Sequence, residues 1–221
     1  MATSETKRKI LQAAVILFNQ NGVAVVTLRD ISDKTGISIG NLAYHFKNKD
    51  AIILELYSQM EEERNALLSK VQFIPSFENI HEQVQHILEL SLKYKFFYVS
   101  TLYLVRSYPS IAKLHREYIN SHIAYIKAML DYSVGVGNLY AEETTGYYAR
   151  LSEVVWSTLH FWLLQEEIRG TKKHNITEAR KVMWELVYPH LTEKGKSKIA
   201  SLVSERNGKK VSFNKKKTVY A

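Results

Sequence analysis

Residues 27–50, TLRDISDKTGISIGNLAYHFKNKD, decide how the N-terminal part of this chain folds. Thr27 is a good N-cap and apolar residues follow it at helical spacing, so a short helix is expected to begin there. Gly36 is expected to end that helix, because glycine readily takes the left-handed backbone of a helix C-terminus. Ser38 then offers a hydroxyl to cap a second helix over 38–46. Two helices joined by a short turn that contains Gly predict a helix-turn-helix, whose second helix enters the major groove of DNA.

The same segment fits the signature of a known protein family. The family pattern is roughly T-x-x-x-I-A-x-x-A-G-V-S-x-G-x-(LIF)-Y-x-(HY)-F-x-(NS)-K, and the residues that match it in register are Thr27, Ile31, Gly36, Ile37, Ser38, Gly40, Leu42, His45, Phe46, Asn48 and Lys49. The segment therefore resembles the DNA-binding head of the tetracycline-repressor (TetR) family of bacterial transcription regulators. Ala43 stands where that family usually has a phosphate-touching tyrosine, and Tyr44 follows one residue later, about 100° around the helix.

Each residue of the segment has a packing interpretation beside a DNA-binding one. Core packing accounts best for four apolar residues, Ile31, Ile37, Leu42 and Phe46. DNA contacts are expected for residues off that apolar face, because Arg and Asn can bond base edges while hydroxyls and Lys suit phosphates. The candidate DNA-binding residues are Thr27, Arg29, Ser38, Ile39, Gly40, Asn41, Tyr44, His45, Lys47 and Lys49. The resemblance implies backbone contacts for Thr27, Tyr44, His45 and Lys49, and groove contacts for Arg29, Ile39, Gly40 and Asn41.

Composition and motifs limit the class of protein. The chain has 221 residues, of which 46% are hydrophobic and none is cysteine, so a sizeable core without disulfides is expected. Neither a signal-peptide core nor an apolar run of about 18 residues occurs, which predicts a cytoplasmic protein without a membrane partner. Phosphate-binding Gly-rich loops, HExxH and Gly-x-Ser-x-Gly are missing, and the eight histidines lack metal-ligand spacing. We therefore expect no enzyme activity, no metal and no cofactor.

Helical periodicity continues along the whole chain and predicts an all-α protein of about nine or ten helices. A three-helix head is expected over 1–50, a helical ligand-binding and dimerisation body over 51–205, and a basic tail over 206–221. The first helix is expected over 6–21 and the fourth from Lys49, so that head and body join without a flexible linker. The expected helices of the body lie over 76–94, 96–106, 109–134, 141–169, 177–188 and 192–206.

The helix expected over 141–169 is apolar on nearly every side, and such a helix has to be covered twice. One face is expected to pack inside its own subunit and the other against a second subunit. The helices over 141–169 and 177–188 of both subunits would then form a four-helix dimer interface. A central core helix in a monomer is the alternative. The candidate interface residues are Tyr148, Val155, Leu159, Trp162, Val182, Met183 and Leu186.

The helix expected over 109–134 carries a stripe of aromatic residues with polar tips. Such stripes are more often core than pocket, but this chemistry also lines ligand cavities. The candidate ligand-binding residues are Phe97, Tyr98, Tyr118, His122, Tyr125, Met129, Trp156 and His160. The resemblance implies a small-molecule inducer in the body and a homodimer on a palindromic DNA operator. The chemistry of the stripe predicts that the inducer is hydrophobic or aromatic. The alternative is a DNA-binding regulator whose body responds to a protein partner.

The formal net charge of +8 is spread unevenly. Residues 1–50 carry seven Lys and Arg against four Asp and Glu, and residues 193–221 carry nine against two. A basic head suits phosphate contacts. The basic tail is interpreted first as a solvated extension and second as a non-specific contact with DNA or a membrane.

Overall fold

The computed structural model describes residues 2–70 and 76–205, and the side chains of residues 5–66, 76–200 and 202. In these ranges the chain forms eleven α-helices and one 3₁₀ helix, which confirms the all-α fold class. Their one β pairing is an isolated bridge between Leu139 and Leu191. The predicted tail, 206–221, lies outside the described residues. None of the helices in the described ranges is long and apolar enough to cross a membrane.

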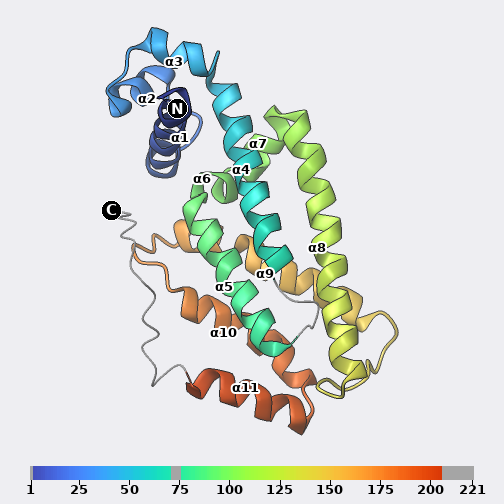
Figure 1. Cartoon of the computed structure of the whole chain (residues 1–221). Helices are drawn as coiled ribbons and strands as arrows, with labels where there is room; N and C mark the ends of the chain where they lie inside the picture. The colour runs from blue at the N-terminus through green and yellow to red at the C-terminus, as the bar shows by residue number, and fades with distance from the viewer. Residues whose placement is uncertain (1, 71–75, 206–221) are drawn as a thin grey trace.

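Three helices form a separate head at one end of the molecule (Figure 1). They are α1 (Ala2–Asn21), α2 (Leu28–Thr35) and α3 (Ile39–His45). The fourth helix, α4 (Lys49–Lys70), starts at the head and runs into the middle of the body, as the sequence predicts. The first helix begins four residues earlier than the expected Thr6, because the polar residues before Thr6 extend the same helix.

Helices from the rest of the chain surround α4 and form the body (Figure 1). They are α5 (Phe77–Lys93), α6 (Lys95–Val99), α7 (Thr101–Ser107), α8 (Pro109–Gly135), α9 (Tyr147–Ile168), α10 (Ile176–Val187), η1 (Tyr188–His190) and α11 (Glu193–Glu205). The long helices α5 and α8 flank α4, while α10 and α11 lie at the end far from the head.

The helix expected over 96–106 is two helices, α6 and α7, and this break raises the number of α-helices to eleven. Ser100 separates them with φ −115° and ψ 18°, which is not helical. The Thr101 hydroxyl donates to the carbonyls of Phe97 and Tyr98 at 2.7 and 3.2 Å, so a side chain replaces part of the backbone bonding at the break.

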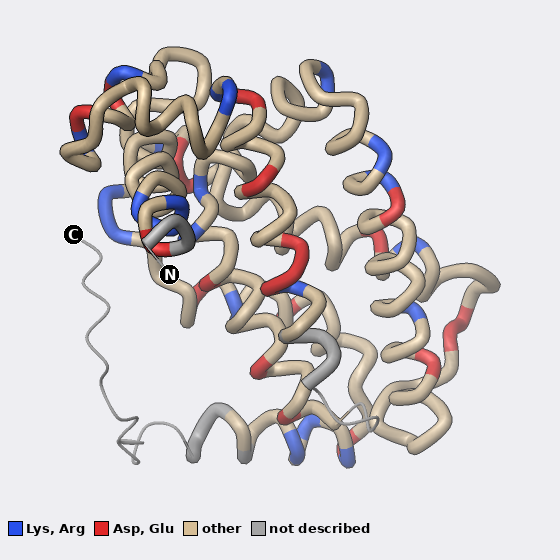
Figure 2. The backbone as a smooth tube through the Cα atoms, turned by 45° about the horizontal axis from the view of Figure 1, so that its top comes forward, with Lys and Arg blue, Asp and Glu red and all other residues tan. Residues whose placement is uncertain are grey.

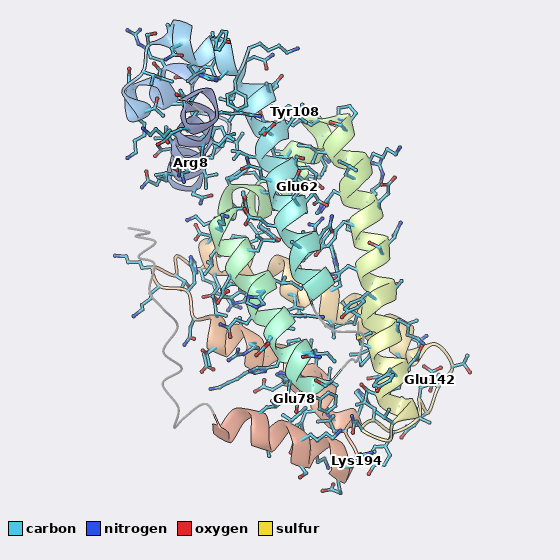
Figure 3. The ribbon with its side chains drawn as sticks, viewed as in Figure 1. Arg8, Glu62, Glu78, Tyr108, Glu142 and Lys194 are labelled. Atoms are coloured by element: carbon cyan, nitrogen blue, oxygen red, sulfur yellow. The ribbon has the colours of Figure 1, made fainter. Side chains whose placement is uncertain are left out.

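The helix expected from residue 141 begins only at Tyr147. Gly146 precedes it with φ +79°, in the left-handed region. The carboxylate of Glu142 accepts hydrogen bonds from the backbone N–H groups of Gly146 and Tyr148, each at 3.0 Å, and thereby caps the helix from the preceding loop (Figure 3). Those two bonds hold the pKa of Glu142 below its usual value.

The hydrophobic core of the head continues into the body. One cluster of buried residues includes Phe18 in α1, Leu56 in α4 and Phe96 in α6. Polar contacts join the same parts, since the Asn19 side-chain amide donates to the Lys93 carbonyl and accepts from the Phe96 N–H, both at 2.9 Å. Helix α1 of the head therefore packs directly against α5 and α6 of the body, and the two parts are not joined by a loop alone.

A second contact between the two parts lies where α7 meets α8. The Tyr108 hydroxyl donates to Asp50 Oδ1, at the start of α4, at 2.8 Å (Figure 3). A separate hydrophobic cluster fills the far half of the body between α5, α8, α9 and α10.

Candidate nucleic-acid interface and interior sites

The helix-turn-helix of the head has the caps that its sequence predicts. Thr27 forms a capping box with Asp30: the Thr27 N–H donates to Asp30 Oδ2 at 2.7 Å, and the Asp30 N–H donates back to Thr27 Oγ1 at 3.2 Å. The hydrogen bond from the Thr27 backbone holds the pKa of Asp30 below its usual value. Gly36 ends α2 with φ +71°, and the Ser38 hydroxyl accepts from the Asn41 N–H at 3.2 Å.

The third helix has one buried and one exposed face. Leu42 is fully buried and Phe46 is 4% exposed, and together they fix the helix to the head. On the other face Ile39 is 51% exposed and Tyr44 is 79% exposed, values that are high for large apolar side chains. The remaining exposed candidates are Thr27, Arg29, Ser38, Gly40, Asn41 and Lys47, while His45 is half-buried with its ring edge-on to Tyr44.

Gly40 lies on the exposed face of α3, yet the fold of this chain does not require a glycine there. Its φ lies outside the left-handed region, and a Cβ at this position would have no described atom within 4 Å. Because Gly40 has no side chain, another molecule can approach the backbone of α3 closely at this position.

Lys49 is placed differently from the expectation of a phosphate contact. Its ammonium donates to the carbonyls of Val23, Val26 and Ala24 at 2.9, 2.9 and 3.4 Å. A lysine has three N–H donors, so these carbonyls occupy all of them. We correct the prediction accordingly: Lys49 ties the loop between α1 and α2 to the start of α4, whereas Lys47, two residues earlier, is exposed.

A cavity of about 70 Å³, partly open to solvent, lies in the far half of the body. Three of the predicted ligand-binding residues line it: His122, Tyr125 and Met129, all in α8. The sequence analysis did not predict the walls that come from α5, α9 and α10, and it placed Val155, Leu159 and Met183 in the dimer interface instead. The lining from those helices includes Phe77, Ile80, Val84, Val155, Leu159, Met183, Trp184 and Val187.

The other five predicted ligand-binding residues do not line this cavity, and a ligand role for them stays a prediction. Phe97, Tyr98, Tyr118, Trp156 and His160 are buried in a neighbouring aromatic cluster. That cluster surrounds Arg64, a residue of α4 that is only 3% exposed and forms an ion pair with Glu61. The sequence analysis assigned neither residue to a site.

Ring contacts hold the cluster together. The guanidinium carbon of Arg64 lies 3.3 Å from the ring centroid of Tyr118. The His160 ring stacks on Trp156 at 4.6 Å and lies 5.3 Å from the ring of His115. Burial and, after it, Arg64 lower the pKa of His115 to about 4. Burial, His115 and Arg64 lower that of His160 to about 3, so both imidazoles are neutral at pH 7.

The predicted dimer interface is wrong at four positions. Tyr148, Val155, Leu159 and Met183 are 2–6% exposed and pack inside the subunit's own core. Trp162 and Leu186 are half-buried, and Val182 is 46% exposed. Helix α9 leaves Tyr147 and Ile168 exposed at its two ends, and between them Val154 and Phe161 on the face opposite to the predicted stripe.

Basic and acidic positions are scattered along the helices of the body (Figure 2), while residues 1–50 carry seven Lys and Arg against four Asp and Glu. No group of His, Cys, Asp and Glu side chains suited to a metal ion occurs in the described part of the chain.

Comparison with known proteins agrees with this architecture. Residues 10–56 match the family described as bacterial regulatory proteins of the tetR family, and residues 57–199 match a model described as a bacterial transcriptional repressor of the TetR type. Among curated proteins, the chain is 29% identical over 90 residues to the probable HTH-type transcriptional regulator YttP of Bacillus subtilis, covering 41% of this chain and 44% of that protein. It is 32% identical over 94 residues to the HTH-type transcriptional repressor KstR2 of Mycolicibacterium smegmatis, covering 36% of this chain and 46% of that protein. The matches thus span less than half the length of these two relatives.

Solved structures share the fold over nearly the full chain. A TetR-family transcriptional regulator from Marinobacter aquaeolei superposes with a TM-score of 0.77 at 24% identity, covering 90% of this chain and 97% of that one. A putative transcriptional regulator from Saccharomonospora viridis in complex with choline gives a TM-score of 0.67 at 18% identity, covering 86% and 99%. The family matches and the curated relatives are named as regulators of transcription rather than enzymes. The chain belongs to the TetR family of bacterial transcriptional regulators.

Proposed function

We propose that this chain is a homodimeric repressor that binds a palindromic operator through α3 and leaves it when a small apolar or aromatic ligand enters the body. The head would comprise residues 1–50, the body 51–205 and the basic tail 206–221. The proposal rests mainly on the two different faces of α3. Buried Leu42 and the adjoining Phe46 fix the helix to the head, while Ile39 and Tyr44 on the other face are exposed.

The exposed residues of the head divide by chemistry into two kinds of contact. Asn41 and Arg29 suit base edges, since their side chains can form paired hydrogen bonds with adenine and guanine. Ser38, Tyr44 and Lys47 suit phosphates, which fix the position of the protein on the duplex without reading its sequence. Gly40 lets the backbone of α3 approach the groove.

Exposed apolar residues on α9 and α10 support the dimer. The proposed interface is built from Val154, Phe161 and Val182, with half-buried Trp162 and Leu186 at its edge. A two-fold axis between two such faces would place two copies of α3 in successive major grooves, about 34 Å apart. This spacing is what a palindromic operator requires.

The apolar cavity between the helices of the body supports a small-molecule effector in preference to a protein partner. A ligand acts as an inducer only if it binds the DNA-free conformation more tightly than the DNA-bound one. Helix α4 links the head with the Arg64 cluster, since it begins at the head, runs into the body and carries Arg64 (Figure 1).

The proposed DNA binding is tested by titrating the purified chain into a labelled inverted-repeat duplex and into a scrambled duplex, with fluorescence anisotropy as the readout. Specific binding predicts at least about a thousandfold preference for the repeat. Equal affinity for both duplexes would contradict operator reading.

A further inference from the structure

Four buried polar atoms without hydrogen-bond partners gather at one place in the body. They are Arg64 Nε, His115 Nδ1, Trp156 Nε1 and His160 Nε2, and none has a partner among the described residues. All four side chains are at least nine-tenths buried. Unpaired buried polar atoms are rare in native proteins, and a group of them from three separate helices indicates a site that receives polar atoms from outside the chain.

The hydrogen-bonding properties of these four atoms indicate which polar group of a ligand they can bind. The Nε–H of Arg64 and the Nε1–H of Trp156 can only donate hydrogen bonds. The neutral imidazoles of His115 and His160 can each donate from one nitrogen. With a guanidinium at its centre, the cluster suits an acceptor that carries negative charge. A carboxylate is the best match, because its two oxygens fit the planar fork of an arginine.

The present counter-ion of Arg64 is suited to exchange. Glu61 contacts one terminal nitrogen of the guanidinium and leaves the Nε unpaired. Its side chain is 19% exposed, whereas that of Arg64 is 3% exposed, so the carboxylate has a route to solvent that the guanidinium lacks. A second carboxylate that replaced Glu61 would keep the buried charge balanced, which an unpaired arginine would not.

The Arg64 cluster shares a wall with the cavity. His122 lines the cavity, and its ring stacks on Tyr118 with centroids 5.2 Å apart. The Tyr118 hydroxyl lies 3.2 Å from His122 Nδ1, and the ring of Tyr118 in turn lies against the guanidinium of Arg64. One molecule could therefore place an apolar part in the cavity and a charged end beside Arg64, with the Tyr118 and His122 rings between.

We propose that the effector of this regulator is a carboxylic acid with an apolar tail, whose carboxylate pairs with Arg64 in place of Glu61 while the tail fills the cavity. This inference rests on the proposed function for the existence of an effector. It adds a consequence for regulation: Glu61 and Arg64 both belong to α4, so the exchange of partners occurs on the helix that carries the head.

The test measures ligand binding to the full chain without DNA. Hexanoate, decanoate and 4-phenylbutanoate are titrated by calorimetry, each beside its matched primary alcohol. The account predicts that at least one acid binds about tenfold more tightly than its alcohol, because only the acid can form the charged pair with Arg64. Acids that bind no better than their alcohols, or no binding by any of the six compounds, would overturn the assignment.

Two variants decide whether Arg64 and Glu61 have the assigned roles. Arg64→Gln removes the charge and is expected to abolish the advantage of the acid. Glu61→Gln removes the competing carboxylate and is expected to tighten acid binding while leaving the alcohol unchanged. The opposite sign for Glu61→Gln refutes the exchange even if Arg64→Gln fails to fold. Operator binding by the ligand-free protein, measured separately, would still stand if the acid were wrong, so the two proposals fail independently.

Discussion

The substitution Lys49→Met separates a structural role for this lysine from a direct DNA contact. Methionine keeps much of the apolar length and removes the ammonium that bonds the carbonyls of Val23, Val26 and Ala24. Two of these bonds are 2.9 Å long and partly buried, while the third is 3.4 Å long and exposed. Hydrogen bonds to charged groups contribute about 1.5–3 kcal/mol when buried, and partial exposure reduces this to about 1 kcal/mol for each of the two short bonds. The free energy of unfolding should therefore fall by about 2 kcal/mol.

The assay combines urea unfolding with operator binding at several salt concentrations. Because Lys49 is expected to act through the fold, Lys49→Met should weaken binding while the slope of log K against log salt stays unchanged. The matched control is Lys47→Ala, at an exposed position two residues away. Loss of one phosphate contact in each subunit should lower the magnitude of that slope by about 1.8 for a dimer, with little change in stability. A lowered slope and full stability for Lys49→Met would refute the structural role.

Four further outcomes follow from the structure. Asn41→Ala should cost about 1–3 kcal/mol at one base of each half-site and little elsewhere, as measured on single-base operator variants; equal loss on every duplex would contradict base reading. Gly195→Ala should destabilise the body by about 1–3 kcal/mol in urea unfolding, because the new Cβ would meet the backbone carbonyl of Asn138; an unchanged midpoint would show that α11 can move aside. Phe161→Asp should convert the dimer into monomers in sedimentation experiments, and a persistent dimer would place the interface elsewhere. The pKa of Asp30 is lowered in the folded head, so its contribution to stability is present above the ordinary value of 3.8 and is lost as the pH falls through the lower folded value. Asp30→Asn should remove this part of the acid sensitivity in thermal melts at different pH. An acid profile identical to that of the wild type would contradict this role.

The head could be predicted from its sequence because its determinants are local. The N-cap Thr27 and its partner Asp30 are three residues apart, and Gly36 ends the same helix. Leu42 and Phe46 recur at helical spacing, so the buried face of α3 can be identified without knowing what covers it. The same reasoning located the start of α4 at Lys49.

Lys49 and Arg64 could not be placed in the same way, because their environments depend on distant residues. The nearest carbonyls to the Lys49 ammonium lie 23 and 26 residues earlier in the chain. Arg64 follows three glutamates, a pattern typical of a solvated helix face, yet it is buried and Tyr118 of α8 packs over its guanidinium. The pattern of charged residues along one helix does not indicate whether a distant helix will bury one of them.

The interface of the dimer was misplaced for a different reason. Helix α9 is apolar on nearly every side, so periodicity shows that it is covered twice and does not show which face the subunit itself covers. The structure buries Tyr148, Val155 and Leu159 against the subunit's own helices and leaves Val154 and Phe161 exposed. For a helix of this kind, only the tertiary packing distinguishes the internal face from the external one.

Selection of bound duplexes from a random DNA pool by the purified full chain tests the central claim most directly. The wild type and Asn41→Ala would be selected in parallel. The account predicts an inverted repeat for the wild type, with half-sites about one helical turn or a multiple of it apart, and the same repeat with one relaxed base per half-site for the variant. Recovery of no consensus by the wild type, with binding that disappears at moderate salt, would contradict sequence-specific reading by α3.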